Sequence, residues 1–275
     1  MAFRLGTVGV ASAGLVAVAA ALLTGSPRVA AAGTDVVWRG APATEVTVVA
    51  DIEDSDGLVY RYYPSYGYRF QPLLSFAKLN EAVAAHRAAV VHHLASTLVA
   101  RGVRRGDALY WEYDFPYGGP VPWTSGFAQA VAAQALSRAG VLVADRSLVR
   151  VADAAFRALR RTLLMPLGGG TWIREYGFTH QAILNAQLQS LISLESYARI
   201  VKSAGARRVV ADLEVAALRL LPRFDLGCWS RYELGGGSAD LHYHTYHVEL
   251  LRRLSSRHSE PIWRRTYLRW SRCLP

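Results

Sequence analysis

Lysine and cysteine are scarce in this sequence of 275 residues. The lysines are Lys78 and Lys202, both inside predicted helices, so no loop lysine is available for Schiff-base chemistry. Gly-x-Ser-x-Gly elbows, P-loops and dinucleotide fingerprints are absent as well, which removes the usual sequence signs of a serine hydrolase or a nucleotide-binding enzyme. The two cysteines are Cys228 and Cys273, and in an exported protein they could form one disulfide that ties the chain end to the body. The alternative is a pair of buried thiols.

Acidic residues are outnumbered, with 21 Asp and Glu against 31 Lys and Arg, and the net charge is +10. Such a balance favours a polyanionic partner: nucleic acid, an acidic polysaccharide or an anionic membrane. The paired arginines are scattered, mostly on predicted helices, and no nucleic-acid-binding module is present, so we expect no nucleic acid partner. Hydrophobic residues make up 52% of the chain and charged residues 19%, which excludes a disordered protein.

Residues 1–32 have the pattern of a targeting segment. Arg4 precedes an apolar run from Leu5 to Leu23, and small residues follow up to Ala32. This pattern predicts a signal peptide cleaved near Ala32, and the run is also long enough to serve as an uncleaved membrane anchor. Under either interpretation the rest of the chain is exported, so we expect a protein that is secreted or anchored on the outer face of a membrane.

The remaining sequence predicts an all-α fold preceded by a short β-hairpin. Alternating residues at 45–51 and 58–63 flank a turn signal at 54–57, which predicts the hairpin, within an arm of residues 33–72. Helical periodicity then occupies residues 73–275. We expect helices at 73–100, 124–139, 147–164, 179–204, 206–221, 245–257 and 261–274.

Long and short connections alternate between these helices. The long ones, at 107–122, 168–177 and 224–243, are rich in aromatic and polar residues. Long loops between antiparallel helix pairs gather on one face, where a rigid scaffold can carry functional groups. The pattern therefore predicts a toroid of α-hairpins with its site at the loop-rich end. The glycine run at 168–170 is expected to be a flexible loop segment.

Tyrosines stand beside charged or imidazole groups in these loops. The segments are WIREY at 172–176, FDLGCWSRYEL at 224–234 and DLHYHTYH at 240–247, with a further aromatic turn at 113–119. A tyrosine has a pKa of about 10 and becomes a base only when its phenolate is stabilised.

Two arginines lie next to these tyrosines. Arg174 precedes Tyr176 by two residues, and Arg231 precedes Tyr232 by one. Either guanidinium could lower the pKa of its neighbouring tyrosine or bind a substrate carboxylate in a bidentate fork.

Three histidines in the last loop, His242, His244 and His247, raise the alternative of a metal site with Asp240 as a fourth ligand. Three histidines alone are a weak pattern, and hydrogen-bonded loop and helix-start histidines explain them as well. We therefore expect no metal.

The motifs together resemble the C-terminal catalytic domain of the D-glucuronyl C5-epimerases, enzymes that convert glucuronate to iduronate in heparosan-type chains. The resemblance extends over roughly residues 73–270 and rests on order and spacing. The matching segments are PWTSGFAQ at 122–129, EY at 175–176, LN at 184–185, LPRFDLG at 221–227, YEL at 232–234 and YHTYH at 243–247.

This resemblance implies an incomplete (α/α) toroid, no cofactor and a site built from tyrosines and a glutamate. Carried over by motif, the catalytic groups are Glu175, Tyr176, Tyr232 and Tyr243. The substrate-binding candidates are Arg174, Arg231, Asn185, Trp123, Tyr117 and His244. The implied partner is an acidic uronate polysaccharide, and a homodimer stays open.

The chain departs from the family pattern at two places before Tyr243. Asp240 stands where the family has an arginine, and His242 stands where it has an acid. The departure concerns recognition of the uronate.

The expected reaction removes the proton on carbon 5 of a uronate and returns a proton to the opposite face. Tyr176, supported by Glu175, would serve one face, and Tyr243 or Tyr232 the other. A uronate lyase would remove the same proton, and a glycoside hydrolase would need two carboxylates, for which Asp114, Glu175 and Asp225 are candidates. A polysaccharide-binding protein without activity is the non-catalytic alternative.

Overall fold

The computed structural model describes residues 51–275. The predicted targeting segment and nearly all of the first predicted strand, at 45–51, lie outside these residues. In the described part, no helix combines the length and the apolar character needed to span a membrane.

Eight α-helices account for most of the described residues. They are α2 (Pro72–Ala84), α3 (Ala88–Ala100), α4 (Gly126–Leu142), α5 (Arg146–Thr162), α6 (Leu184–Val201), α7 (Ala204–Leu220), α8 (Leu241–Ser255) and α9 (Pro261–Ser271), and the short 3-10 helix η1 (Leu221–Phe224) follows α7. Consecutive helices pack as four antiparallel hairpins: α2 with α3, α4 with α5, α6 with α7, and α8 with α9.

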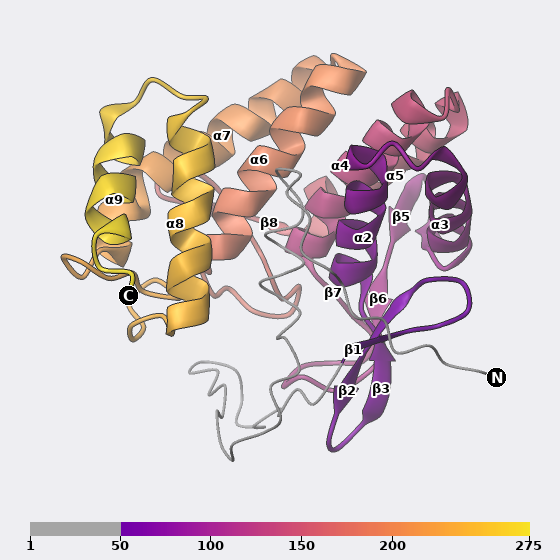
Figure 1. Cartoon of the computed structure of the whole chain (residues 1–275), viewed down its shortest axis with the longest axis horizontal. Helices are drawn as coiled ribbons and strands as arrows, with labels where there is room; N and C mark the ends of the chain where they lie inside the picture. The colour runs from indigo at the N-terminus through magenta and orange to yellow at the C-terminus, as the bar shows by residue number, and fades with distance from the viewer. Residues whose placement is uncertain (1–50) are drawn as a thin grey trace.

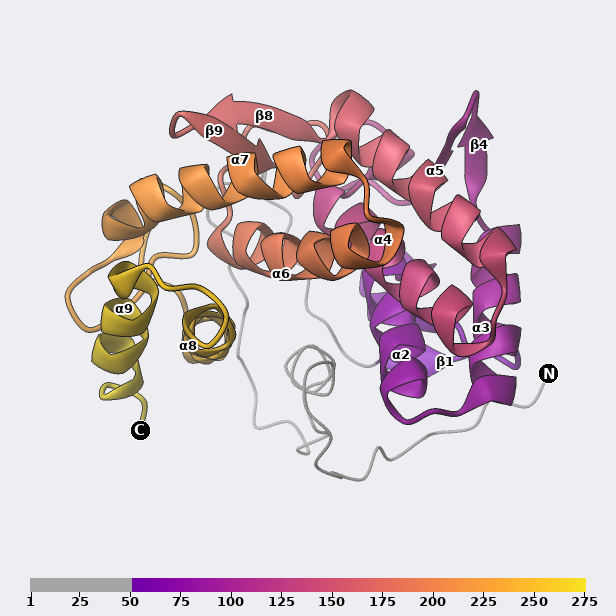
Figure 2. The ribbon, with the colours of Figure 1, turned by 90° about the horizontal axis from the view of Figure 1, so that it is seen from above.

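The first helices of the hairpins form an inner row, in which α2 contacts α4, α4 contacts α6 and α6 contacts α8. Their partners lie on the outside, and the row curves into an open arc (Figure 2). Helices α4 and α6 lie in the middle of the arc and are buried on nearly every side, since each has neighbours to both sides and an outer helix behind it. This is the predicted incomplete (α/α) toroid.

The predicted helix at 73–100 is two helices in the structure. Helix α2 ends at Ala84, and His86 takes a left-handed conformation with φ of 52° before α3 begins. The amide of Arg87 donates to the carbonyl of Ala82, which closes the end of α2. Sequence periodicity missed the break because no glycine or proline marks it.

Side-chain caps set several helix starts. Asp240 caps α8, with its Oδ1 accepting from the amide of Tyr243 at 2.7 Å, so this helix begins four residues before the predicted one. Ser125 and Ser203 cap α4 and α7 in the same way.

The predicted hairpin arm is a three-stranded antiparallel sheet in the described residues. It contains β1 (Asp51–Glu53), β2 (Val59–Tyr63) and β3 (Gly67–Phe70), with β2 in the centre and Asp51 paired with Arg61 in register. The predicted turn at 54–57 is present, since Asp54 Oδ1 accepts from the amides of residues 56 and 58 and Gly57 has a φ of 78°. Strand β3 was not predicted.

Three short hairpins interrupt the long connections. They pair β4 (Val103–Arg105) with β5 (Ala108–Tyr110), β6 (Glu112–Tyr113) with β7 (Trp123–Thr124), and β8 (Leu164–Leu167) with β9 (Gly170–Ile173). The expected flexible loop at 168–170 is therefore wrong. Gly168 and Gly169, with φ of 63° and 74°, form the two-residue turn of a tight hairpin, which requires positive φ at both positions.

The chain end is fixed to the loop between α7 and α8. Cys228 and Cys273 form a disulfide, with Cα atoms 5.9 Å apart. Beside it, Asp225 pairs with Arg269 and accepts from Trp270 Nε1 at 3.0 Å. These contacts hold α9 against the loop that carries the YEL motif.

Candidate functional site

The inner helices α2, α4, α6 and α8 all begin on the same side of the molecule, and the long connections gather on that side (Figure 1). The connections span residues 101–125, 163–183 and 221–240, and each leads into the first turn of α4, α6 or α8. The sheet β1–β3 leads into α2 and lies at this end together with β6 and β7 (Figure 1). All the motifs singled out in the sequence therefore reach one region.

An aromatic cluster, separate from the main hydrophobic core, fills much of this region. Tyr113 and Trp123 stack with ring centroids 4.0 Å apart and planes 6° apart, and Tyr117 stacks on Tyr176 at 5.4 Å. The buried members of this aromatic cluster are Tyr63, Tyr113, Phe115, Tyr117, Trp123 and Tyr176.

Backbone hydrogen bonds fix Glu175 and Tyr176 beside the start of α4. The amide of Gly126 donates to the carbonyl of Arg174 at 2.9 Å, and the amide of Gly177 donates to the carbonyl of Thr124 at 2.8 Å. Glycine is required at 126 because a Cβ atom there would lie 2.6 Å from the carbonyl oxygen of Arg174. The close approach of the two segments sets the position of both functional side chains.

Tyr232 is fixed to the start of α6 in a similar way. The amide of Leu184 donates to the carbonyl of Tyr232, and the amide of Leu234 donates to the carbonyl of Ala182, both at 3.0 Å. Tyr243 stands in the first turn of α8, and its ring centroid lies 4.6 Å from that of Tyr232.

The three predicted catalytic tyrosines come together. The side chains of Tyr176 and Tyr232 are hydrogen-bonded to each other. Tyr243 lies close enough to both tyrosines for its charge to raise their pKa values. Tyr176 is 6% exposed and the hydroxyl oxygen of Tyr232 is buried, whereas Tyr232 and Tyr243 as whole residues are half-buried, so parts of the group reach the surface.

Glu175 supplies a carboxyl group among these phenols. Burial raises its pKa to about 8, and its Oε2 has no hydrogen-bond partner within residues 51–275. Burial, and then the charge of Glu175, raises the pKa values of Tyr232 and Tyr243 well above 10. The same two causes raise the pKa of Tyr176. The phenols are therefore proton donors at neutral pH, and the carboxyl of Glu175 can give or take a proton near that pH.

Two of the predicted substrate-binding residues belong to the same region. Trp123 Nε1 donates to the carbonyl of Phe115 at 2.9 Å, and its ring packs against Tyr176. Tyr117 stacks on Tyr176. Burial raises the pKa of Tyr117, and the hydrogen bond between the two hydroxyls offsets part of this rise.

Asn185, a third predicted substrate-binding residue, is the second residue of α6. Its side chain is buried, and its Oδ1 has no hydrogen-bond partner in the described part of the chain. An unsatisfied buried acceptor costs free energy, which a ligand hydroxyl would recover.

The other three predicted substrate-binding residues are engaged elsewhere. Arg174 donates to the carbonyls of Thr179 and Thr162, both at 3.0 Å. Arg231 donates to the carbonyl of Gly236. These arginines stabilise their own loops, and none of these contacts directs either guanidinium toward the three tyrosines.

His244 is the last of the three. Its ring stacks on Trp229 with centroids 3.8 Å apart, and its Nδ1 accepts from the amide of Ser230 at 3.1 Å. His244 and His247 both reach the hydroxyl of Ser230, at 2.9 and 2.8 Å, while His242 is exposed. Burial, and then His244, lowers the pKa of His247 to about 3. The buried pair is thus part of the packing between α8 and the preceding loop.

Arg61 is a charged residue of the site that sequence reasoning missed. It lies on β2, and its charge acts on Tyr63, Tyr117 and Tyr243. The signal was present in the alternation of the segment at 58–63, which puts Arg61 and Tyr63 on one face of the strand.

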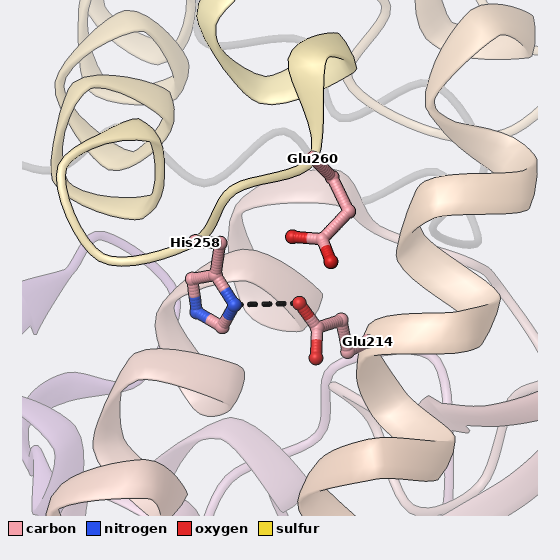
Figure 3. Close-up of side chains that lie close together, drawn as sticks. All are labelled: Glu214, His258 and Glu260. Atoms are coloured by element: carbon pink, nitrogen blue, oxygen red, sulfur yellow. Dashed lines mark ion pairs between the residues drawn. The ribbon is translucent and has the colours of Figure 1, made fainter.

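Outside this region, Glu214, His258 and Glu260 lie with their ligand atoms within 4.8 Å of one another, a spacing that a metal site would have (Figure 3). His258 already faces a carboxylate at each nitrogen, Glu214 at Nδ1 and Glu195 at Nε2, both at 2.6 Å. We interpret the group as an ion-pair network that joins α6, α7 and the loop before α9.

Comparison with known proteins identifies the family. The sequence profile of the D-glucuronyl C5-epimerase C-terminus matches residues 105–272. The chain belongs to this family. The profile match includes Glu175, Tyr176, Tyr232 and Tyr243, which the family resemblance had indicated. No curated protein matches the chain.

Solved structures similar to this epimerase-family chain share its fold. An endo-β-1,4-glucanase of family GH8 from an Achatina fulica gut metagenomic library has a TM-score of 0.58 and 14% identity, over 81% of this chain and 74% of that one. Endoglucanase Cel10 from Klebsiella pneumoniae has a TM-score of 0.57 and 13% identity, over 81% of this chain and 76% of that one. Endo-β-1,4-glucanase CMCax from Acetobacter xylinum has a TM-score of 0.52 and 13% identity, over 74% of this chain and 73% of that one. At such identities the likeness shows the fold alone.

Replacing His258 in the ion-pair network should destabilise the protein. His258→Ala leaves Glu195 and Glu214 facing each other, with side chains only 14% and 22% exposed, so we expect the free energy of unfolding to fall by about 2–3 kcal/mol. Urea unfolding followed by circular dichroism measures the loss. Arg252→Ala, which breaks the exposed pair with Glu249, is the control and should cost less than about 1 kcal/mol. Equal losses would show that the network contributes no more than a surface pair.

The raised pKa of Glu175 predicts a pH-dependent stability. The folded protein keeps the Glu175 proton up to a pH of about 8, whereas the unfolded chain loses it near 4.5, so the folded state binds more protons between these values. The Glu175 contribution to the free energy of unfolding therefore falls as the pH rises from about 4.5 to 8.

Glu175→Gln should remove this contribution. Urea unfolding at pH 5, 6.5 and 8 should show the variant gaining stability relative to the unsubstituted protein as the pH rises. Asp56→Asn, in the turn between β1 and β2 with a side chain 59% exposed, should show no such trend. A pH-independent difference for Glu175→Gln would mean that its carboxyl is not desolvated.

Proposed function

We propose that this protein is an exported epimerase that inverts carbon 5 of glucuronate residues in an acidic polysaccharide. The observation that carries the proposal is the convergence of Tyr176, Tyr232 and Tyr243 around Glu175 at the loop-rich end of the toroid. Membership of the epimerase family supports the same reaction.

The chemistry requires groups on both faces of the sugar ring. The hydrogen on carbon 5 is α to the carboxylate, and its removal gives a dianionic enediolate, so it is a very weak acid. A base must stand near its face, a proton donor near the opposite face, and the site must stabilise the negative charge that develops. Because one proton leaves and one returns, the net reaction is an isomerisation that consumes no oxidant or reductant.

The pKa values suggest how these roles are divided. Glu175, whose carboxyl titrates near pH 8, is ionised in a fraction of the molecules at neutral pH, and in that form it takes the proton of the Tyr176 hydroxyl while Tyr176 takes the proton from carbon 5. Tyr243 or Tyr232, which keep their protons, deliver one to the opposite face. In this scheme the C–H bond breaks on the Glu175 side and a new C–H bond forms on the other side, and the reverse reaction exchanges the roles.

The hydrolase alternative needs a second carboxylate, and the other candidates are placed unfavourably. Asp225 pairs with Arg269 and Trp270 at the chain end. Asp114 is exposed and faces Arg69 at 3.7 Å. A lyase would use the same groups as the epimerase and then break the bond at carbon 4, so its product would absorb in the ultraviolet.

Two further features support export and an acidic glycan. The disulfide between Cys228 and Cys273 is typical of proteins that fold in an oxidising compartment. The net charge of +10 favours an anionic polymer as partner.

Incubation in heavy water tests the proposal directly. NMR should show solvent deuterium entering carbon 5 of a glucuronan or heparosan, without ultraviolet absorption and without new reducing ends. Tyr176→Phe should slow this exchange by at least about 100-fold, the usual contribution of a general acid or base. Tyr267→Phe, on α9 and outside the aromatic cluster, is the control and should exchange normally.

The same experiment can separate the two faces. Tyr176→Phe should differ from Tyr232→Phe and Tyr243→Phe in whether it slows exchange from the glucuronate or from the iduronate epimer, since each face is used first in one direction only. Full exchange in Tyr176→Phe would refute the assignment of this tyrosine.

A further inference from the structure

The proposed reaction needs a cation for the uronate carboxylate, and the sequence motifs do not supply one. Arg174 and Arg231 donate to backbone carbonyls of their own loops. Asp240, which stands where the family has an arginine, caps α8 through the amide of Tyr243. None of these contacts presents a cation to the tyrosines, so the other elements at this end of the toroid are the next candidates to supply one.

Arg61 is built into the site from the N-terminal sheet. Asp51 accepts from its Nε at 2.7 Å and from its Nη2 at 2.8 Å, a bidentate pair between directly opposite residues of β1 and β2. The Arg61 side chain is 16% exposed, and that of Asp51 is 12% exposed. A fork held at two atoms is fixed in orientation, so little side-chain entropy is left to lose when a ligand binds.

The face of β2 that carries Arg61 points toward the aromatic cluster. Side chains two residues apart lie on the same face of a strand, and Tyr63, two residues after Arg61, packs on Phe115 with ring centroids 4.4 Å apart. Tyr62, on the opposite face, packs on Tyr68 of β3 instead.

The charge of Arg61 reaches both sides of the site. It lowers the pKa values of Tyr113 and Tyr117 in the aromatic cluster and that of Tyr243 on α8, in each case against a larger rise from burial. Glu175 acts on the same three tyrosines with the opposite sign. A cation and a titratable carboxyl thus act on one group of phenols.

We infer that Arg61, held in place by Asp51, binds the carboxylate of the uronate substrate and stabilises the charge of the enediolate. The inference rests on the proposed function and names the residue that selects a hexuronate over the corresponding neutral hexose. A guanidinium has five N–H donors, and Asp51 accepts from Nε and Nη2, so a substrate carboxylate would bind at the other donors in exchange for the contacts that they make in the unliganded protein.

Selection can be measured as binding, independently of turnover. The probes are a glucuronan oligosaccharide and the same oligosaccharide with its carboxyl groups reduced to alcohols, titrated by calorimetry into the Tyr176→Phe protein. We expect the uronate to bind about 10–100-fold more tightly than the reduced probe, the range of a charge-assisted hydrogen bond. Arg61→Gln should remove this preference and leave the affinity for the reduced probe unchanged.

Further variants separate recognition from a structural role. Arg61→Lys keeps the charge without the fork and should retain part of the preference. Arg69→Gln changes the residue opposite Arg61 on β3 and is the matched control, with an unchanged preference. Where loss of Arg61 leaves Asp51 unpaired and the protein unstable, the double variant Asp51→Asn with Arg61→Gln removes both charges, and it should still lack the preference.

The outcomes distinguish this inference from the proposed function. If the preference survives in Arg61→Gln, or if both probes lose affinity equally, Arg61 does not bind the carboxylate, whatever the exchange experiment shows. If the preference depends on Arg61 but no deuterium exchange occurs in the unsubstituted protein, the carboxylate site stands and the epimerase proposal fails.

Discussion

The chemistry of this site depends on the burial of one carboxyl group, that of Glu175, among phenol rings. In water this group would be ionised and a weak base, whereas burial raises its pKa to about 8. The same burial, together with the charge of Glu175, keeps Tyr176, Tyr232 and Tyr243 protonated. A carboxyl that titrates near neutrality and several phenols that do not ionise suit the proposed reaction, in which one group removes a proton and another delivers a proton to the opposite face.

The toroid makes this burial possible because its inner helices all begin at one end. Each long connection is hydrogen-bonded to the start of an inner helix, as Gly126 shows for α4 and Leu184 for α6. The segments that carry Glu175 and Tyr232 are thereby fixed by rigid helices on either side of the site. Such anchoring matters because a misplacement of about 1 Å between reacting groups can slow a reaction roughly 100-fold. The glucanases of similar fold show that this scaffold is not tied to one sequence.

The sequence was a good guide to whatever depends on local pattern. Helical periodicity and the alternation of connections predicted the toroid and the loop-rich end, and the motifs predicted the tyrosines that converge. It was a poor guide to long-range contacts. The roles of Arg174 and Arg231 depend on which carbonyls lie near them after folding, and the break at His86 has no glycine or proline to mark it. The alternation at 58–63 placed Arg61 on one face of a strand, but its importance comes from the docking of β2 beside residues far along the chain, which local pattern does not predict.

The charge balance of the site explains how a family member can lack an arginine near its last tyrosine. At that place Asp240 serves α8 as a cap, which stabilises the helix that carries Tyr243. A negative group there would repel a uronate unless a cation acts on the same tyrosine from another direction. Arg61 does so from β2, and its partner Asp51 lies opposite it on the neighbouring edge strand β1. In the proposed mechanism the positive charge is thus separated from the position that sets the start of α8, so the helix and the proposed acidic substrate are served by two different residues.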